Sequence, residues 1–107
     1  MEQPYVYLGQ LTDEVGEIPS DSILSRTFYR DENLKAILFG FAPGQELSEH
    51  TASVPAILHF VQGQARLTLG DDHMQAGPGT WVHMQAGLPH SIYAETPVVM
   101  LLLMLAK

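Results

Sequence analysis

Histidines are the side chains in this sequence best suited to chemistry. The chain has five of them and no cysteine, so thiolate nucleophiles, disulfides and cysteine-bound metal centres are excluded. His50 follows Gly44 and His90 follows Pro89, which places each near a turn. A neutral imidazole can bind a transition metal, accept a hydrogen bond or transfer a proton near neutral pH. We therefore take His50 and His90 as the first candidates for a functional site.

Short apolar segments between glycine and proline turns are the elements that must position these histidines. In Ala65–Leu69, apolar residues alternate with Arg66 and Thr68, which is the pattern of a half-buried strand. Short strands at such intervals indicate an all-β sandwich or barrel. Strands are predicted at residues 25–30, 34–41, 57–61, 65–69, 81–84, 91–94 and 98–105, with an edge strand at 5–8 and an acidic loop at 11–19.

The length and charge of the chain limit the class of protein. Its 107 residues predict one domain, residues 1–107, in which residues 1–30 form a less regular N-terminal arm. The net charge of -7 repels phosphate groups, so we expect no nucleic-acid or membrane partner. The N-terminus does not have the pattern of a signal peptide, and no apolar run approaches the roughly 20 residues that span a bilayer. This composition is typical of a cytoplasmic protein.

Residues 44–63 resemble the first of two motifs that characterise the cupin superfamily. This motif is written G-x5-H-x-H-x3-E-x6-G. Gly44, His50 and Gly63 stand in register with it, whereas Ala52 takes the place of the second histidine and Ala56 that of the glutamate. The glycine-to-glycine spacing is therefore retained, but two of the motif's polar residues are replaced by alanine.

Residues 79–94 resemble the second motif, which is written G-x5-P-x-G-x2-H-x3-N. Gly79, Gly87 and His90 are in register, while Gln85 stands for the proline and Ala94 for the asparagine. Two motifs in register on a strand-rich chain are hard to obtain by chance. The chain also resembles a subgroup of small single-domain cupins in its Ser-Glu-His-Thr-Ala and Pro-His segments at 48–52 and 89–90.

This resemblance implies a fold and a metal chemistry. The fold is a small antiparallel jelly-roll barrel, also called a double-stranded β-helix. In metal-binding cupins, the two motif histidines point into the barrel with a third histidine and a glutamate, and hold a divalent ion such as Fe, Ni, Zn, Cu or Mn. This chain keeps only His50 and His90 of that set.

Two interpretations of the histidines remain open. In one, His50 and His90 bind a divalent metal with ligands from elsewhere. In the other, they are polar residues of a metal-free barrel, hydrogen-bonded to each other, to water or to a ligand. We expect His59 to point outward, since it lies an odd number of residues from Ala56, and His73 to lie in a solvated hairpin turn. The candidate replacement ligands are Glu46, Glu49, His59, Met84, Gln85 and Met104.

Three functions fit these residues. The first is a barrel that binds a small organic ligand in a pocket formed by His50, His90, Gln85 and Tyr93, with or without a metal. The second is a metal-dependent dioxygenase, isomerase or decarboxylase, a range implied by the resemblance, with Glu49 or Tyr93 as acid or base. The third is a metal-free enzyme in which a pocket histidine transfers a proton.

A homodimer is the expected assembly. The segment Val98–Leu105 is apolar at both alternating sets of positions. A barrel of this size leaves one face of such a strand uncovered, and a second copy would bury it. The resemblance to small cupins, which are commonly homodimers, implies the same assembly.

Overall fold

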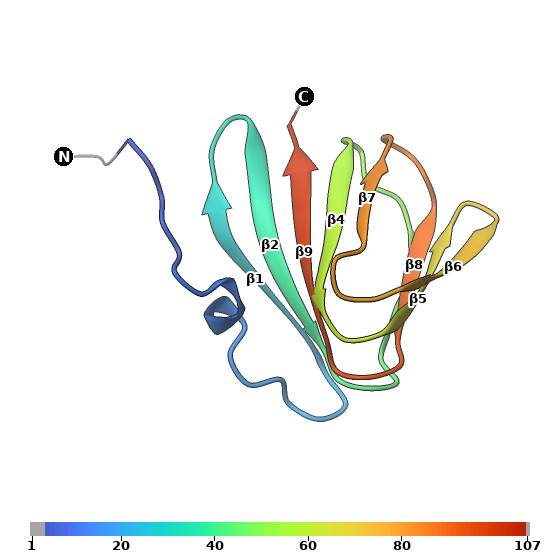
Figure 1. The fold of residues 1–107 in the computed structure, drawn as a ribbon. Coiled ribbons are helices and arrows are strands. Elements are labelled where there is room, and N and C mark those ends of the chain that lie inside the picture. Colours follow the sequence, from blue (N-terminus) through green and yellow to red (C-terminus); the bar gives the residue numbers. More distant parts are fainter. Residues whose placement is uncertain (1–3, 107) are drawn as a thin grey trace.

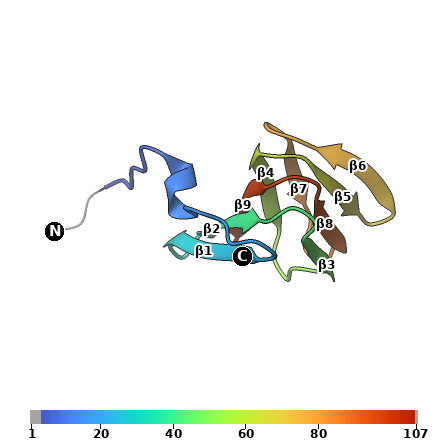
Figure 2. The ribbon, with the colours of Figure 1, turned by 90° about the horizontal axis from the view of Figure 1, so that it is seen from below.

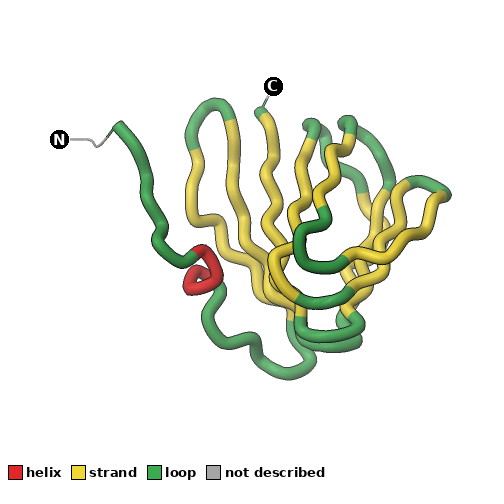
Figure 3. The backbone as a smooth tube through the Cα atoms, in the orientation of Figure 1, coloured by secondary structure: helices red, strands yellow, loops and turns green. Residues whose placement is uncertain are grey.

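The computed structural model describes residues 4–106 and consists of two antiparallel sheets that face each other (Figure 1). No helix in this part of the chain is long and apolar enough to cross a membrane. Within residues 4–106, one short 3-10 helix, η1, precedes the strands (Figure 3). The elements are η1 Leu11–Glu14, β1 Ile23–Arg30, β2 Leu34–Phe41, β3 Glu46–His50, β4 Ala56–Gln62, β5 Ala65–Leu69, β6 Asp72–Ala76, β7 Trp81–Met84, β8 His90–Ala94 and β9 Val98–Leu105.

The strands form a jelly-roll barrel, as the sequence predicts. One sheet has the order β1-β2-β9-β4-β7 and the other the order β3-β8-β5-β6. All paired strands in both sheets run antiparallel. Seen from below, the two sheets form opposite walls around a common interior (Figure 2). Strands distant in sequence lie side by side, since β9 pairs with both β2 and β4.

The core lies between the inner faces of the two sheets. On β4 the buried residues Ala56, Leu58 and Phe60 alternate with partly exposed ones, so one face of the strand points into the barrel. Leu67 and Ile92 face them from the second sheet and are also fully buried. Burial of each large side chain contributes about 1.5–3 kcal/mol to folding.

The turn between β4 and β5 lies at the lower end of the barrel in Figure 1, and it contains a glycine. Gly63 joins β4 to β5 with a φ of +90°, and a Cβ atom there would lie 2.0 Å from the carbonyl oxygen of Pro97. The adjacent Gln64 carbonyl accepts a hydrogen bond from the amide of Glu95 at 2.9 Å. The β4–β5 turn and the β8–β9 loop are therefore in direct contact, and only glycine fits between them.

Most strand predictions agree closely with the structure. β2, β5, β7 and β9 have the predicted bounds, and β1, β4 and β8 differ from the predictions by one or two residues. The prediction missed β3 and β6, because the side chains of both strands are mostly exposed and lack an apolar alternation.

The N-terminal segment differs from its prediction. Residues 5–8 form no strand, and η1 lies within the segment predicted as an acidic loop. The chain then packs across the outer face of β2, where Val15 and Ile18 approach Gly40 so closely that a side chain at residue 40 would collide with them. The irregular arm ends before β1, which begins at Ile23.

Candidate ligand pocket

A cavity of about 340 Å³ opens at the end of the barrel where β4 begins and where β7 and β9 end, at the top of Figure 1. The four-stranded sheet contributes His50 and His90. The five-stranded sheet contributes an apolar wall, and the loop between β3 and β4 forms the rim. The remaining lining residues are Thr51, Ala52, Ser53, Ala56, Met84, Leu102 and Met104.

An irregularity in β3 turns His50 toward the cavity. Leu47 lies opposite Ile92, and His50 lies opposite His90. Three residue steps on β3 therefore match two steps on β8, so β3 carries one extra residue, as in a β-bulge. Without it, strict alternation from the inward-facing Leu47 would place His50 on the outer face.

The two imidazoles are in contact and are oriented by the backbone. Their ring centroids are 4.2 Å apart and the rings are tilted by 56°. The Nδ1 atom of His50 lies 2.7 Å from the carbonyl oxygen of Ser48, and that of His90 lies 2.9 Å from the carbonyl oxygen of Leu88. A carbonyl oxygen only accepts, so each Nδ1 carries the proton and donates. In the neutral rings both Nε2 atoms are therefore free to accept a hydrogen bond or bind a metal.

His90 is held in its neutral form. Its side chain is buried, with 5% of the residue exposed, whereas His50 is exposed at the rim. Burial lowers the pKa of His90 below its usual value because water no longer stabilises the charged ring, and the neighbouring His50 lowers it further. The hydrogen bond to the Leu88 carbonyl opposes both effects. His90 is therefore a neutral acceptor near pH 7.

The opposite wall of the cavity is apolar and carries two thioethers. Ala56 lies between two strands in the sheet, with Met84 of β7 as its partner on one side and Met104 of β9 on the other. All three side chains line the cavity. Because Ala56 carries only a methyl group, the space between the two methionines stays open toward the histidines.

The structure places Gln85 and Tyr93 away from this cavity. Gln85 follows β7 and lines a separate hollow beside Leu88 and Pro89. Tyr93 is three residues beyond His90 on the same strand, so its side chain points to the opposite face of the sheet. The predicted set of four pocket residues thus divides into two histidines inside the barrel and two residues outside the cavity.

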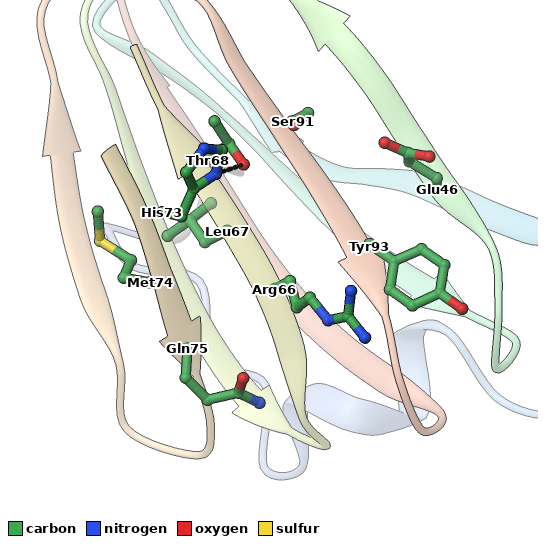
Figure 4. Close-up of a pocket in the computed structure, with 9 residues that line it drawn as sticks. All are labelled: Glu46, Arg66, Leu67, Thr68, His73, Met74, Gln75, Ser91 and Tyr93. Carbon is green, nitrogen blue, oxygen red and sulfur yellow. Dashed lines mark hydrogen bonds between the residues drawn. The ribbon is translucent and has the colours of Figure 1, made fainter. Parts of the chain in front are cut away.

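Tyr93 belongs to a polar hollow on the outer face of the four-stranded sheet (Figure 4). The guanidinium of Arg66 lies 5.3 Å from the centre of its ring. Arg66 also donates to Glu95 at 2.9 Å, and Gln75 donates to the other oxygen of that carboxylate at 2.7 Å. This network lowers the pKa of Glu95, chiefly through the Gln75 bond and then through Arg66.

His59 and His73 also lie outside the barrel. His59 alternates with the buried Leu58 and Phe60 and points outward, as the alternation predicts. The turn predicted for His73 is wrong: the residue lies within β6, and its Nδ1 atom is 3.0 Å from the hydroxyl of Thr68. Neither residue lines the cavity that holds His50 and His90.

Comparison with known proteins shows the family. A family model described as a cupin domain matches residues 37–105, which is most of the chain. The chain belongs to the cupin family. The matched region contains both motifs and every strand that contributes to the cavity. None of the curated proteins compared with this cupin is significantly similar to it.

Solved structures support the same fold. A Streptococcus pyogenes protein of unknown function, SPY1581, is 30% identical, with a TM-score of 0.82, and the match covers 100% of this chain and 91% of that one. A cupin superfamily protein of Desulfitobacterium hafniense is 24% identical over 85% and 84% of the two chains, with a TM-score of 0.80. KdgF of a Halomonas species is 18% identical over 85% and 86%, with a TM-score of 0.72.

The usual cupin donor set does not fit this barrel. Ala52 and Ala56 stand where the motif has a histidine and a glutamate. Within residues 4–106, no group of three or more histidines, aspartates or glutamates is placed to hold a metal ion. Glu46 lines the outer hollow with Tyr93, and Glu49 is exposed, so neither replaces the missing carboxylate. A hard divalent ion would have only two imidazoles here, fewer than the three or four ligands such sites offer.

Proposed function

We propose that this cupin binds a small organic ligand in the cavity lined by His50 and His90. The ligand has an apolar body and one hydrogen-bond donor. The observation that carries the proposal is the division of the cavity into an apolar wall and a pair of backbone-oriented imidazoles. Ligand pockets in proteins are commonly apolar with a few placed polar groups.

The ligand's donor follows from the tautomer of the histidines. Because both Nδ1 atoms donate to backbone carbonyls, both Nε2 atoms accept. A hydroxyl or N–H group on the ligand would satisfy one of them, while a purely apolar molecule would leave the buried His90 without that bond. The cavity of about 340 Å³ lies near the lower end of the range for ligand pockets, roughly 300–1,000 Å³, so the ligand is small.

The alternative of a metal-dependent dioxygenase, isomerase or decarboxylase has no specific observation in its favour. It requires a divalent ion, and the described side chains do not provide the donor set for one. A proton-transfer enzyme would need a second titratable group in the cavity besides the two imidazoles, and the lining contains none. Ligand binding is the function that the lining itself supports.

Methionine methyl groups offer a direct test. Protein labelled with ¹³C at its methionine methyls would be titrated with phenol, which combines an apolar ring with a hydroxyl donor. We expect saturable shifts at Met84 and Met104, which line the cavity, and none at Met74, which is exposed on β6. Toluene has the same ring without the donor, and we expect it to bind at least about tenfold more weakly because the hydrogen bond is lost.

The variant Ala56→Leu tests whether phenol binds in this cavity and not elsewhere on the protein. It adds a branched side chain between Met84 and Met104 and fills the cavity from the apolar wall. Phenol-induced shifts should disappear in this variant if the cavity is the site. Shifts that persist in Ala56→Leu, or that are equal for phenol and toluene, would refute the proposal.

We also propose that the protein forms a homodimer. The outer positions of β9 include Leu101 and Leu103, which are only half-buried in the single chain. The nearby N-terminal arm exposes Tyr5, Val6 and Tyr7 at 66%, 62% and 79%. Association of two copies would remove this apolar surface from water. Sedimentation equilibrium should give twice the chain mass of 11.8 kDa, and a mass of one chain at micromolar concentration would contradict the dimer.

A further inference from the structure

We propose that the polar hollow on the outer face of the four-stranded sheet is a second binding site, which takes a neutral, hydroxyl-rich molecule such as a monosaccharide. The four-stranded sheet separates this hollow from the cavity that contains His50 and His90. Its volume is about 670 Å³, compared with about 340 Å³ for the inner cavity. The inference goes beyond the proposed function, because it concerns another face of the protein and another kind of ligand.

Strand pairing arranges the polar side chains of the hollow in two rows across the sheet (Figure 4). In the first row, Tyr93 of β8 is the partner of Glu46 on β3 and of Arg66 on β5. Arg66 is in turn the partner of Gln75 on β6. Direct partners on one face of a sheet have Cβ atoms about 4.5–5.5 Å apart, so the rows form a continuous surface. The second row consists of Ser91, Thr68 and His73.

Arg66, near the middle of the hollow, is held in place by its neighbours. Its Nε atom donates to Glu95 at 2.9 Å, and its guanidinium lies 5.3 Å from the centre of the Tyr93 ring. Gln75 donates to the other oxygen of the Glu95 carboxylate at 2.7 Å. A guanidinium has further N–H donors on its two Nη atoms, and the bond to Glu95 does not use them. Because these side chains are already ordered, a ligand that binds them costs less conformational entropy.

Charges of both signs border the hollow, and this favours a neutral ligand. Arg66 has Glu95 on one side, and Glu46 lies on the other side of Tyr93. An anion that approached Arg66 would meet both carboxylates, and the net charge of -7 on the whole chain would add to the repulsion. A cation that approached either carboxylate would meet the guanidinium. A neutral molecule avoids both repulsions.

The hydrogen-bonding groups of the hollow match those of a sugar. Arg66 only donates, Glu46 only accepts, and the hydroxyls of Ser91, Thr68 and Tyr93 do either. Each hydroxyl of a sugar is also both a donor and an acceptor, so a molecule with several of them can satisfy this mixed set. Hydrogen bonds to charged groups are the stronger ones, which makes Arg66 and Glu46 the main anchors. The apolar ligand proposed for the inner cavity would leave these groups unpaired.

A titration with simple sugars tests the site. Protein labelled with ¹⁵N would receive D-glucose, D-galactose or D-mannose in separate experiments. We expect at least one of them to shift the side-chain amide signals of Gln75 saturably and to leave those of Gln85 unchanged, because Gln85 lines a different hollow. For the sugar that binds most tightly, the uronic acid and the 2-amino sugar of the same configuration should each bind about threefold more weakly, because each carries a charge.

Two arginines provide a matched pair of variants. Arg66 and Arg26 each donate through Nε to a glutamate in an exposed ion pair, but Arg26 lies on β1, away from the hollow. Arg66→Gln should weaken sugar binding at least about tenfold, since it removes charged donors, whereas Arg26→Gln should leave it unchanged. Tyr93→Phe keeps the ring and removes the hydroxyl, so we expect a loss of about threefold.

The inner cavity shows whether each variant is folded. Phenol should still shift the methyl signals of Met84 and Met104 in Arg66→Gln, and the sugars should shift neither signal in the original protein. The inference is overturned if none of the three sugars shifts Gln75, if the charged sugars bind as tightly as the neutral one, or if Arg66→Gln binds as well as Arg26→Gln. Loss of phenol binding alone, with sugar bound as expected, would refute the inner-cavity proposal and leave this one standing.

Discussion

The two ends of the barrel interior share strands β4 and β9 but differ in how they are filled. At the closed end, Phe41, Phe60 and Val98 fill the space between the sheets and are fully buried. At the open end, Ala56 lies on the wall and Ala52 in the loop at the rim, and a cavity remains beside the histidines. Because side chains alternate between the two faces of a strand, every second side chain points inward at both ends. Large inward side chains fill the space and form a core, whereas small ones leave a pocket.

The largest expected effect comes from emptying the closed end. Phe60→Ala should lower the free energy of unfolding by about 3–5 kcal/mol, because it removes a fully buried ring and leaves a void. Met104→Ala at the open end should lower it by less, since Met104 is only partly buried and already borders a cavity. Urea denaturation of both variants measures the difference, and equal losses would mean that the two ends are packed alike.

The turn at the closed end offers a second contrast. Gly63→Ala combines a φ of +90° with a collision against the Pro97 carbonyl, so we expect a loss of about 3 kcal/mol or more in unfolding free energy. Gly44→Ala has a similar φ of +82° with no atom within 4 Å, and should lose only about 1–2 kcal/mol for the backbone conformation. Thermal or urea unfolding compares them. If Gly44→Ala were as damaging, the contact with Pro97 would not be the cause.

The same enlargement should cost more stability at the closed end than at the open end. Ala65→Leu adds volume to a fully buried position and should cost about 1–3 kcal/mol through overpacking. Ala56→Leu grows into the open cavity, so its cost in stability should be smaller, below about 1 kcal/mol, while binding of phenol is lost. Denaturation curves and methyl spectra of the two variants provide the test, which fails if Ala65→Leu is the better tolerated.

The smallest expected effect is the pH dependence of the unfolding free energy that arises from His90 at the open end. The pKa of His90 is lower in the folded protein than in the unfolded chain, where it is about 6.5. The unfolded chain therefore takes up a proton first as the pH falls. The stability contributed by neutral His90 is fully present above about pH 6.5 and is lost as the pH falls through the lower folded-state pKa.

The test of this pH effect is a comparison of variants. His90→Asn should flatten the decline in unfolding free energy between about pH 7 and 5. The matched variant His73→Asn, on the outer surface, should retain the slope of the original protein. An unchanged slope in His90→Asn would assign the decline to other groups.

The local pattern of apolar and turn-forming residues explains which strands can be predicted from the sequence. β2, β5, β7 and β9 have apolar runs or alternations bounded by glycine or proline, and their bounds were predicted from those features. β3 and β6 were missed because they present mostly exposed side chains and are held by pairing with β8 and β5. Such pairing is a long-range contact that no local pattern reports.

The candidate site was predictable only in part. The spacing of the cupin motifs pointed to His50 and His90 as partners, and they are in contact. Gln85 and Tyr93 belong to the same stretch of sequence as His90, but they lie outside the cavity. Sequence neighbours on a strand alternate between its faces, so closeness in sequence does not predict a shared pocket.

The sequence by itself determined the strand-rich fold, the alanines that empty the open end and the two histidines that motif spacing brings together. Only the tertiary structure decided where those histidines point and what they face. The extra residue in β3 turns His50 inward, and the pairing of β4 with β7 and β9 sets Met84 and Met104 on either side of Ala56. The physical reason is that a bulge and a strand order are set by pairing partners far away in the chain.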